Sequence, residues 1–190
     1  TLHTLHGRAI AYATGAKLFN PKLKVMVISG DGDLSSIGGN HIIHAARRNI
    51  DMTVVCANNG IYGMTGGQVA STTPIGARTT TTPGGNLERP FDLCKLVEAS
   101  GATFVARQPV ATPVPLTRTL KKAIAHRGFA FVDVPSPCPT QFGRRNAFRT
   151  AYDMIKALKD SCIPVEKAKG LDPAELQGKM VVGEFVNLTA

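Results

Sequence analysis

A carboxylate and a carboxamide stand directly after two apolar runs of this chain. Gly30-Asp31-Gly32-Asp33 follows the run at residues 24–29, and Asn58-Asn59 follows the run at residues 53–57. Residues 35–49 have the length and composition of a helix, so the two runs are expected to be parallel strands that end at one edge of a sheet. Open parallel sheets bind ligands at that edge. The side-chain oxygens of Asp31 and Asn59 suit a hard cation such as Mg²⁺, which in turn suits a diphosphate.

The two glycines of the first motif have expected mechanical roles. Gly30 and Gly32 are expected to adopt backbone angles closed to other residues and to leave room for a phosphate. The helix that follows is expected to direct its N-terminal N–H groups at the anion. A lone Gly-Asp-Gly is usually an ordinary turn. Here, however, Asn58-Asn59 follows 25 residues after Asp33, behind a second strand, and this spacing matches the thiamine diphosphate motif.

Longer stretches of the chain resemble the β subunits of 2-oxoacid:ferredoxin oxidoreductases, most closely the 2-oxoglutarate type. The resemblance runs from residue 1 to about residue 150, and nearly to the end if Gly183-Glu184-Phe185 is counted. Asn58-Asn59-Gly60-Ile61-Tyr62-Gly63-Met64-Thr65-Gly66-Gly67-Gln68 resembles the cofactor loop of that family. Three shorter segments also match: Ile42-Ile43-His44-Ala45-Ala46-Arg47-Arg48-Asn49, Thr4-Leu5-His6-Gly7-Arg8-Ala9 and Ser136-Pro137-Cys138-Pro139-Thr140.

The resemblance implies a role for each site residue. Asp31, Asn59 and the backbone carbonyl of Ile61 would ligate Mg²⁺, and a carbonyl ligand explains why Ile61 needs no polar side chain. Met64 and Gly66 lie where the family varies with substrate, and His6 would face the cofactor pocket as a catalytic residue, although a lone helical histidine is more often structural. The residues expected to bind thiamine diphosphate are Gly30, Gly32, Asp33, Asn59, Gly63 and Thr65.

Cys138 lies between two prolines. In the iron–sulfur members of the family, a cysteine in this setting is the last of four ligands of a [4Fe–4S] cluster, and the other three lie in an N-terminal segment. This chain opens on Thr1 with no such segment, and we expect that an N-terminal segment is missing. Because one thiolate cannot hold a cluster, the alternative is a buried structural thiol. Cys56 and Cys94 are expected to be buried free thiols.

The resemblance also implies an activity and its partners. A 2-oxoacid, 2-oxoglutarate being the best single expectation, would be decarboxylated oxidatively with coenzyme A and ferredoxin, giving acyl-CoA, CO₂ and reduced ferredoxin. The carboxylate that activates the cofactor would come from an α subunit, with γ and δ subunits as further partners, so the chain alone is expected to be inactive. The alternatives are a non-oxidative thiamine-dependent decarboxylase or synthase subunit, and a non-catalytic nucleotide-binding subunit.

The composition limits the class of protein. The formal net charge of +9 calls for an anionic partner, but the basic residues are scattered and aromatic residues make up only 6%, which argues against nucleic acid. No run approaches the roughly 20 apolar residues that span a membrane. The four cysteines form no C-x-x-C pair, which suits a reducing cytoplasm better than a disulfide scaffold.

Alternating helices and strands predict one domain over residues 1–190, an α/β doubly wound, mostly parallel sheet. Residues 60–90 form a long loop rich in Gly, Thr and Pro, which is expected to be functional. The tail from about residue 160 is expected to be irregular. Helices are predicted at 4–18, 35–49, 90–100, 115–127 and 151–159, and strands at 24–29, 53–57, 103–107 and 129–134.

Overall fold

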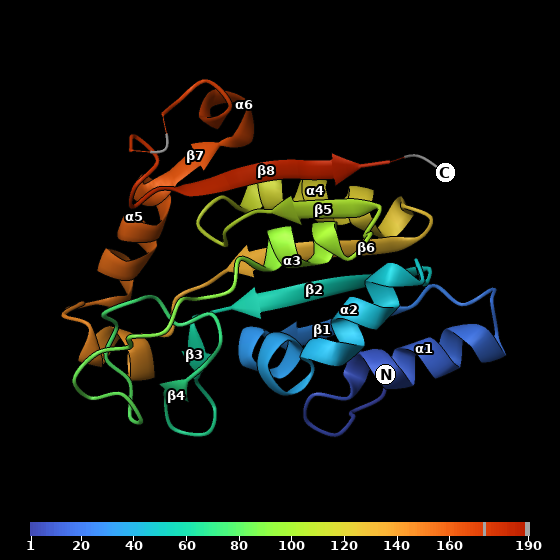
Figure 1. The fold of residues 1–190 in the computed structure, drawn as a ribbon, viewed down its shortest axis with the longest axis horizontal. Helices are drawn as coiled ribbons and strands as arrows, with labels where there is room; N and C mark the ends of the chain where they lie inside the picture. The colour runs from blue at the N-terminus through green and yellow to red at the C-terminus, as the bar shows by residue number, and fades with distance from the viewer. Residues whose placement is uncertain (173, 189–190) are drawn as a thin grey trace.

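One six-stranded sheet runs through the centre of the computed structural model, which describes residues 1–172 and 174–188 (Figure 1). Four neighbouring strands are parallel, the strand after them is antiparallel to its neighbour, and the last is parallel to that one. In spatial order the strands are β1 (Met26–Gly30), β2 (Met52–Asn58), β6 (Phe129–Pro135), β5 (Phe104–Arg107), β8 (Met180–Asn187) and β7 (Cys162–Pro164). The predicted α/β fold with a mostly parallel sheet is confirmed.

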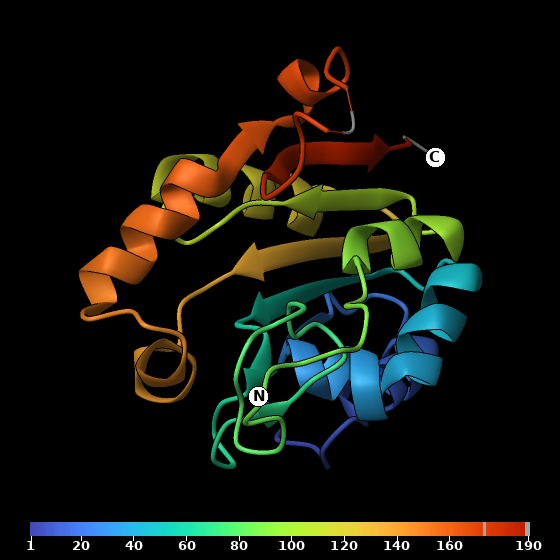
Figure 2. The same cartoon turned by 60° about the vertical axis from the view of Figure 1, so that its left-hand side comes forward.

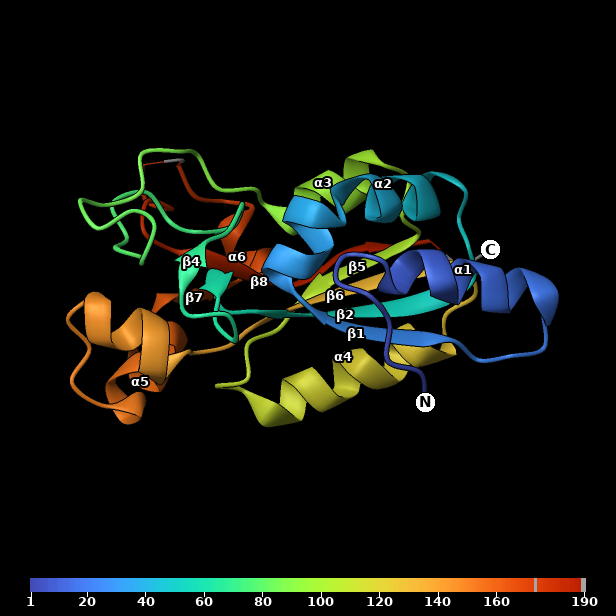
Figure 3. The same ribbon diagram turned by 90° about the horizontal axis from the view of Figure 1, so that it is seen from below.

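Helices cover both faces of the sheet (Figure 3). Three helices lie on one face, α1 (Ala9–Phe19), α2 (Gly39–Arg47) and α3 (Leu93–Ala99), and α4 (Pro113–Ala125) lies on the other. The larger apolar core fills the space between the first three and the sheet, while a smaller one lies under α4. All seven residues of β6 are buried, as expected for a central parallel strand covered on both faces.

The strand register places the two polar motifs side by side. Gly30 of β1 pairs with Ala57 of β2, and Asn58 pairs with Pro135 of β6. Asp31 and Asn59 therefore follow adjacent strand ends, as the sequence predicts. Figures 1 and 2 show that α5 (Ala151–Ser161) stands at this same end of the sheet, to which the arrowheads of β2 and β6 point.

Two predicted helices differ from the structure at a glycine. The helix predicted at 35–49 is divided into a π-helical turn, η1 (Gly32–Ile37), and α2. The division falls at Gly38, where a Cβ atom would lie only 2.4 Å from the carbonyl oxygen of Asp33. The helix predicted at 4–18 begins at Ala9 because Gly7, with φ +72°, forms a turn before it. Both glycines thus bring the chain close to the polar end of β1.

The segment after residue 160 differs from the expected irregular tail. It contains β7, the short helix α6 (Val165–Ala168) and β8, which joins the main sheet through antiparallel pairing with β5. This pairing joins residues about eighty positions apart, for instance Phe104 with Asn187. Local composition carries little information about such distant pairing. The start of α5, in contrast, is encoded locally, by a capping box between Thr150 and Asp153.

The loop at residues 60–90 contains one small hairpin, β3 (Ile61–Tyr62) and β4 (Gln68–Val69), and is otherwise irregular. Polar side chains organise it. The buried Asn86 amide donates to the carbonyl oxygens of Thr73 at 2.8 Å and Glu88 at 3.0 Å. Thr73 in turn donates to the carbonyl of Gly60 at 2.6 Å. None of the helices described is long and apolar enough to cross a membrane.

Candidate functional site

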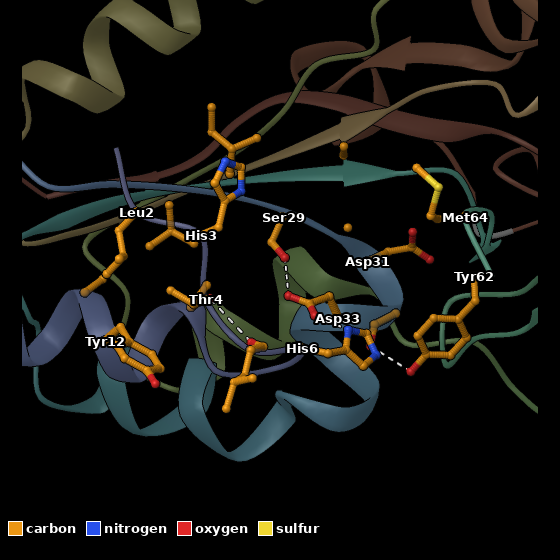
Figure 4. Close-up of a pocket in the computed structure, with 18 of the residues that line it drawn as sticks. Leu2, His3, Thr4, His6, Tyr12, Ser29, Asp31, Asp33, Tyr62 and Met64 are labelled. Atoms are coloured by element: carbon orange, nitrogen blue, oxygen red, sulfur yellow. Dashed lines mark hydrogen bonds and ion pairs between the residues drawn. The ribbon is translucent and has the colours of Figure 1, made fainter.

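A cavity of about 800 Å³ lies at the carboxyl ends of β1 and β2. Its polar end contains Asp31, Asn59 and Tyr62, and its walls continue along α1 and the edge strand β1. Figure 4 shows Leu2 and Tyr12 at one end of the cavity and Tyr62 and Met64 at the other. The cavity therefore combines a polar end with a long apolar wall, as a cofactor with a diphosphate and an aromatic ring requires.

Asp31 is the deepest polar group at this site. Its side chain is 1% exposed and accepts hydrogen bonds from the Asn59 backbone N–H, at 3.2 Å, and from the Thr72 hydroxyl. Burial raises the pKa of Asp31, and these two hydrogen bonds oppose the rise. Among the ion pairs of residues 1–172 and 174–188, none includes Asp31. Its buried carboxylate is therefore stabilised by neutral donors alone.

Asn59 and Ile61 lie on the same turn as the backbone N–H that binds Asp31. The Asn59 side-chain oxygen accepts the Ile61 backbone N–H at 3.2 Å, which holds the turn closed. Ile61 itself is buried. The structure thus brings Asp31, Asn59 and Ile61 together, as the sequence predicts. Thr72, which completes the surroundings of Asp31, was not predicted, because nothing in the spacing distinguishes it from the other threonines of the loop.

Gly30 and Gly32 matter at the site because they have no side chain, not because they adopt special backbone angles. Neither has a positive φ, so the expectation about their backbone angles is wrong. A Cβ at Gly32 would lie 2.6 Å from the ring of Tyr62, whose hydroxyl donates to the Gly32 carbonyl at 3.0 Å. A Cβ at Gly30 would meet nothing within 4 Å, so this glycine borders open space in the cavity.

His6 and Asp33 form a second polar group at the cavity. Asp33 accepts hydrogen bonds from the Ser29 hydroxyl and, at 2.6 Å, from the Gly7 backbone N–H, and it pairs with the His6 Nδ1 atom. The His6 and Tyr62 rings pack edge to face with centroids 5.7 Å apart (Figure 4). Three protein groups already bind the Asp33 carboxylate. Asp33 is therefore better placed to orient His6 than to contact a diphosphate.

Of the remaining predicted cofactor and substrate residues, three lie at the cavity and one does not. Met64 is 99% exposed, and Thr65 is exposed with its hydroxyl donating to the Gln68 side chain at 2.7 Å. Both line the cavity, as does Gly63, whereas Gly66 does not. Gly66 has φ +119°, a conformation that suits glycine. Exposed side chains at a cavity mouth are free to contact a ligand that enters.

Cys138 lies beside Gly63, in the loop that is predicted to bind the cofactor. It is half-buried, and its sulfur would be 3.4 Å from a Cβ placed at Gly63. Among the residues described here, no group of three or more His, Cys, Asp or Glu side chains could hold a metal ion. This part of the chain therefore supplies one thiol and no cluster site. Cys56 and Cys94 are buried free thiols, as predicted, and burial raises the pKa of each.

A buried ion pair that was not predicted from the sequence lies next to the site. Asp133 of β6, 1% exposed, accepts the Arg107 Nε–H at 2.7 Å and the Asn58 side-chain N–H at 3.1 Å. Arg107 also pairs with Asp92, the N-cap of α3, at 2.5 Å. The signal was available, since Asp133 is the one charged residue in the apolar strand Phe129–Pro135.

Comparison with known proteins agrees with this geometry. Residues 1–134 match the family described as "Thiamine pyrophosphate enzyme, C-terminal TPP binding domain". The chain is 56% identical to the 2-oxoglutarate synthase subunit KorB of Methanocaldococcus jannaschii, covering 99% of this chain and 70% of that protein. It is 54% identical to the KorB subunit of Methanothermobacter marburgensis, with 98% and 66% covered. The chain thus spans about two thirds of the length of these relatives.

A solved structure shows the same fold. The 2-oxoglutarate:ferredoxin oxidoreductase of Magnetococcus marinus, solved with 2-oxoglutarate, coenzyme A and succinyl-CoA bound, superimposes with a TM-score of 0.84 and 37% identity. The match covers 99% of this chain and 65% of that one. The resemblance expected from the cofactor motifs is confirmed, and the chain belongs to the thiamine diphosphate-binding β-subunit family of 2-oxoacid:ferredoxin oxidoreductases, the family of the 2-oxoglutarate synthase subunits KorB.

Proposed function

We propose that this chain is the β subunit of a 2-oxoglutarate:ferredoxin oxidoreductase and that it binds the Mg²⁺–diphosphate end of thiamine diphosphate. The overall reaction would convert 2-oxoglutarate, coenzyme A and oxidised ferredoxin to succinyl-CoA, CO₂ and reduced ferredoxin. The observation that carries the proposal is Asp31, a buried carboxylate without a cationic partner among the described residues, at the polar end of a large cavity. The names of its relatives support the choice of substrate.

The donor set fits Mg²⁺. Magnesium prefers oxygen ligands and is usually held by one or two carboxylates together with substrate phosphates. Asp31 would supply the carboxylate, Asn59 the amide oxygen and Ile61 its backbone carbonyl. Burial raises the pKa of Asp31, and a cation beside it would favour the ionised form. The open space at Gly30 would admit the diphosphate.

The remaining residues would orient the cofactor and the substrate. Gly63 and Thr65 would hold the diphosphate at the mouth of the cavity, and Met64 and Gly66 would contact the substrate side. Asp33, fixed by Ser29 and Gly7, would hold His6 in one orientation beside the cofactor. The bound cofactor would supply a carbanion and an electron sink for decarboxylation, and the apolar wall along α1 would exclude water from it.

The complete site needs another subunit. The activating carboxylate is proposed to come from an α subunit, against which the loop at residues 60–90 would pack, with γ and δ subunits as further members. Ferredoxin and coenzyme A are both anionic, and the net charge of +9 would attract them. The four free cysteines suit the cytoplasm as its compartment.

Cys138 is proposed as a [4Fe–4S] ligand only in a protein that supplies three more cysteines. The support is its place beside the cofactor loop at Gly63, where electrons would leave the cofactor. In protein purified without oxygen, a cluster would give an optical and paramagnetic signal, which Cys138→Ser should diminish. An unchanged signal would make Cys138 a structural thiol.

The proposed activity is tested with the assembled enzyme. With its partner subunits, the chain should support ferredoxin reduction that requires 2-oxoglutarate, coenzyme A and thiamine diphosphate, and the chain alone should not. Carbon dioxide release without ferredoxin reduction would favour the non-oxidative decarboxylase. Failure to bind thiamine diphosphate at all would favour the non-catalytic nucleotide-binding subunit.

A further inference from the structure

The Asn58-Asn59 turn lies between two buried carboxylates. On one side, Asp31 accepts the backbone N–H of Asn59 at 3.2 Å. On the other, Asp133 accepts the side-chain N–H of Asn58 at 3.1 Å. Asn59 lines the cavity that contains Asp31, whereas Asn58 and Asp133 line a second cavity next to it.

Asn58 fixes the turn with both ends of its amide. Its nitrogen donates to Asp133, while its oxygen accepts the Gly60 backbone N–H at 3.3 Å. Gly60 has φ +73°, so the backbone reverses sharply at this point. The next residue along, Ile61, donates to Asn59. Any movement of Asn58 would therefore displace the two groups proposed to hold the cation, the Asn59 amide and the Ile61 carbonyl.

Arg107 holds Asp133 in place from the far side. Its Nε–H donates to Asp133 at 2.7 Å, and its Nη2 binds Asp92 at 2.5 Å. Its guanidinium also lies over the Phe185 ring, 5.7 Å from the centroid, so it contacts β8. An arginine held by three contacts has little freedom to move, so the Asp133 carboxylate that it binds is also held in one position.

We propose that Asp133, fixed by Arg107, is a positioning residue for the cation site, and that it acts through Asn58 on Asn59 and Ile61. The proposal rests on the proposed function, because it assumes that Asn59 and Ile61 hold the cation. Residues that orient metal ligands without touching the metal commonly alter metal affinity by about 10–100-fold when they are removed.

The primary test compares Asn58→Ala with Ser136→Ala in the enzyme assembled with its partner subunits. Ser136 is a matched control because its hydroxyl contacts the Asn58 carbonyl, at 3.4 Å, without taking part in the Asp133 bond. Calorimetric titration with Mg²⁺ and thiamine diphosphate should show affinity about 10–100-fold lower for Asn58→Ala and unchanged for Ser136→Ala. The thermal unfolding temperature should stay near that of wild type for Ser136→Ala and should fall much less for Asn58→Ala than for Arg107→Met, because the Arg107–Asp133 pair is intact.

A double-mutant cycle separates the Asp133 bond from the Gly60 bond. Asp133→Asn leaves one acceptor oxygen for two donors, and the charged Arg107 competes with Asn58 for it. If Asp133 acts through Asn58, Asp133→Asn lowers the affinity in the wild-type background and has little further effect in Asn58→Ala. Wild-type affinity in either single variant, or fully additive losses, would overturn the proposal.

The outcomes also separate this proposal from the function on which it rests. If Asp31→Ala weakens the binding of Mg²⁺–thiamine diphosphate but Asn58→Ala does not, the cofactor site stands and the positioning role of Asp133 is refuted. If Asp31→Ala leaves the binding unchanged, the proposed cation site itself is refuted, and the positioning role with it.

Discussion

Asp31 and Asp133 are two carboxylates at the same end of one sheet, each 1% exposed, with opposite surroundings. Asp133 binds a guanidinium and an amide, whereas Asp31 binds a hydroxyl and a backbone N–H. Burial raises the pKa of both, and Arg107 opposes the rise only at Asp133. The Asp133 site is therefore complete within the chain, whereas the Asp31 site is suited to a cation that comes from outside.

This difference follows from the cost of burying charge. An ionised carboxylate deep in a protein is unfavourable unless a cation and hydrogen bonds compensate it. A structural ion pair meets that need permanently. A binding site leaves it to the ligand. Mutation of the Arg107–Asp133 pair is therefore expected to lower the free energy of unfolding, whereas mutation of Asp31 is expected to lower the affinity for the cofactor without lowering the free energy of unfolding.

The largest effect is expected at Arg107. Arg107→Met leaves Asp133 buried without its cation and should lower the free energy of unfolding by about 3–5 kcal/mol. Chemical denaturation of the purified chain measures this. Arg118→Met is the control, because Arg118 is exposed on α4, and its effect should stay within about 0.5 kcal/mol. Equal effects of the two substitutions would show that the buried pair contributes little to folding.

Asp31 should show the reverse pattern. Asp31→Asn removes the proposed charged ligand, so the affinity for Mg²⁺–thiamine diphosphate should fall about 10–100-fold or more. Losses of that size are seen even for residues that only orient a metal ligand. Without cofactor, the free energy of unfolding should not fall, because no buried cation loses its partner. Asp133→Asn, which does deprive a buried cation, should lower it. A large loss of stability in metal-free Asp31→Asn would contradict the distinction between the two carboxylates.

A smaller contrast is expected within the proposed ligand set. Asn59→Ala removes a side-chain ligand and should weaken cofactor binding. Ile61→Val keeps the backbone carbonyl and should leave binding nearly unchanged, at a cost to folding of about 0.5–1.5 kcal/mol for one lost methylene. Calorimetry of both variants checks this, and weaker binding by Ile61→Val would show that the side chain itself contributes.

The smallest effect is expected at the ion pair between the buried Lys17 and the partly exposed Asp51. The effect of this half-exposed pair can be compared with that of the fully buried one. Burial alone would raise the pKa of Asp51, but hydrogen bonds from Lys17, at 2.6 Å, and from Gly128 hold it below its ordinary value. Because this pKa is lowered by folding, the pair stabilises above the unfolded pKa, near 3.9, and the contribution is lost as the pH falls through the folded value.

Since Asp51 is 38% exposed, its contribution should be below about 1 kcal/mol. Asp51→Asn should lower the free energy of unfolding at pH 7 by less than about 1 kcal/mol, have little effect at pH values below the folded pKa of Asp51, and reduce the acid dependence of unfolding below about pH 4. An effect at neutral pH as large as that of Arg107→Met would mean that burial does not set the strength of these pairs.

The sequence predicted what local patterns encode. Apolar runs located β1, β2, β5 and β6, and the spacing of Asp31 and Asn59 after two of those runs placed both residues at one cavity, the candidate cofactor site. The parts that were missed depend on distant contacts. Thr72 reaches Asp31 across 41 positions, and Arg107 meets Asp133 across 26.

The order within the loop at residues 60–90 also could not be predicted from local patterns. It has few large apolar residues, so the sequence offered no core for it to form. Its order comes from hydrogen bonds such as those of Asn86 and Thr73, whose pairing depends on the folded backbone. Polar networks of this kind leave no periodic pattern that could be recognised beforehand.

The dependence of thiamine diphosphate binding on Mg²⁺, in the assembled wild-type enzyme and in Asp31→Asn, tests the central claim most directly. If Asp31 is a ligand of Mg²⁺, calorimetric titration should show that Mg²⁺ strengthens cofactor binding in the wild type. This strengthening should be largely lost in Asp31→Asn. If the wild type and Asp31→Asn show the same response to Mg²⁺, Asp31 is not a ligand of the cation, and the account of this site is wrong.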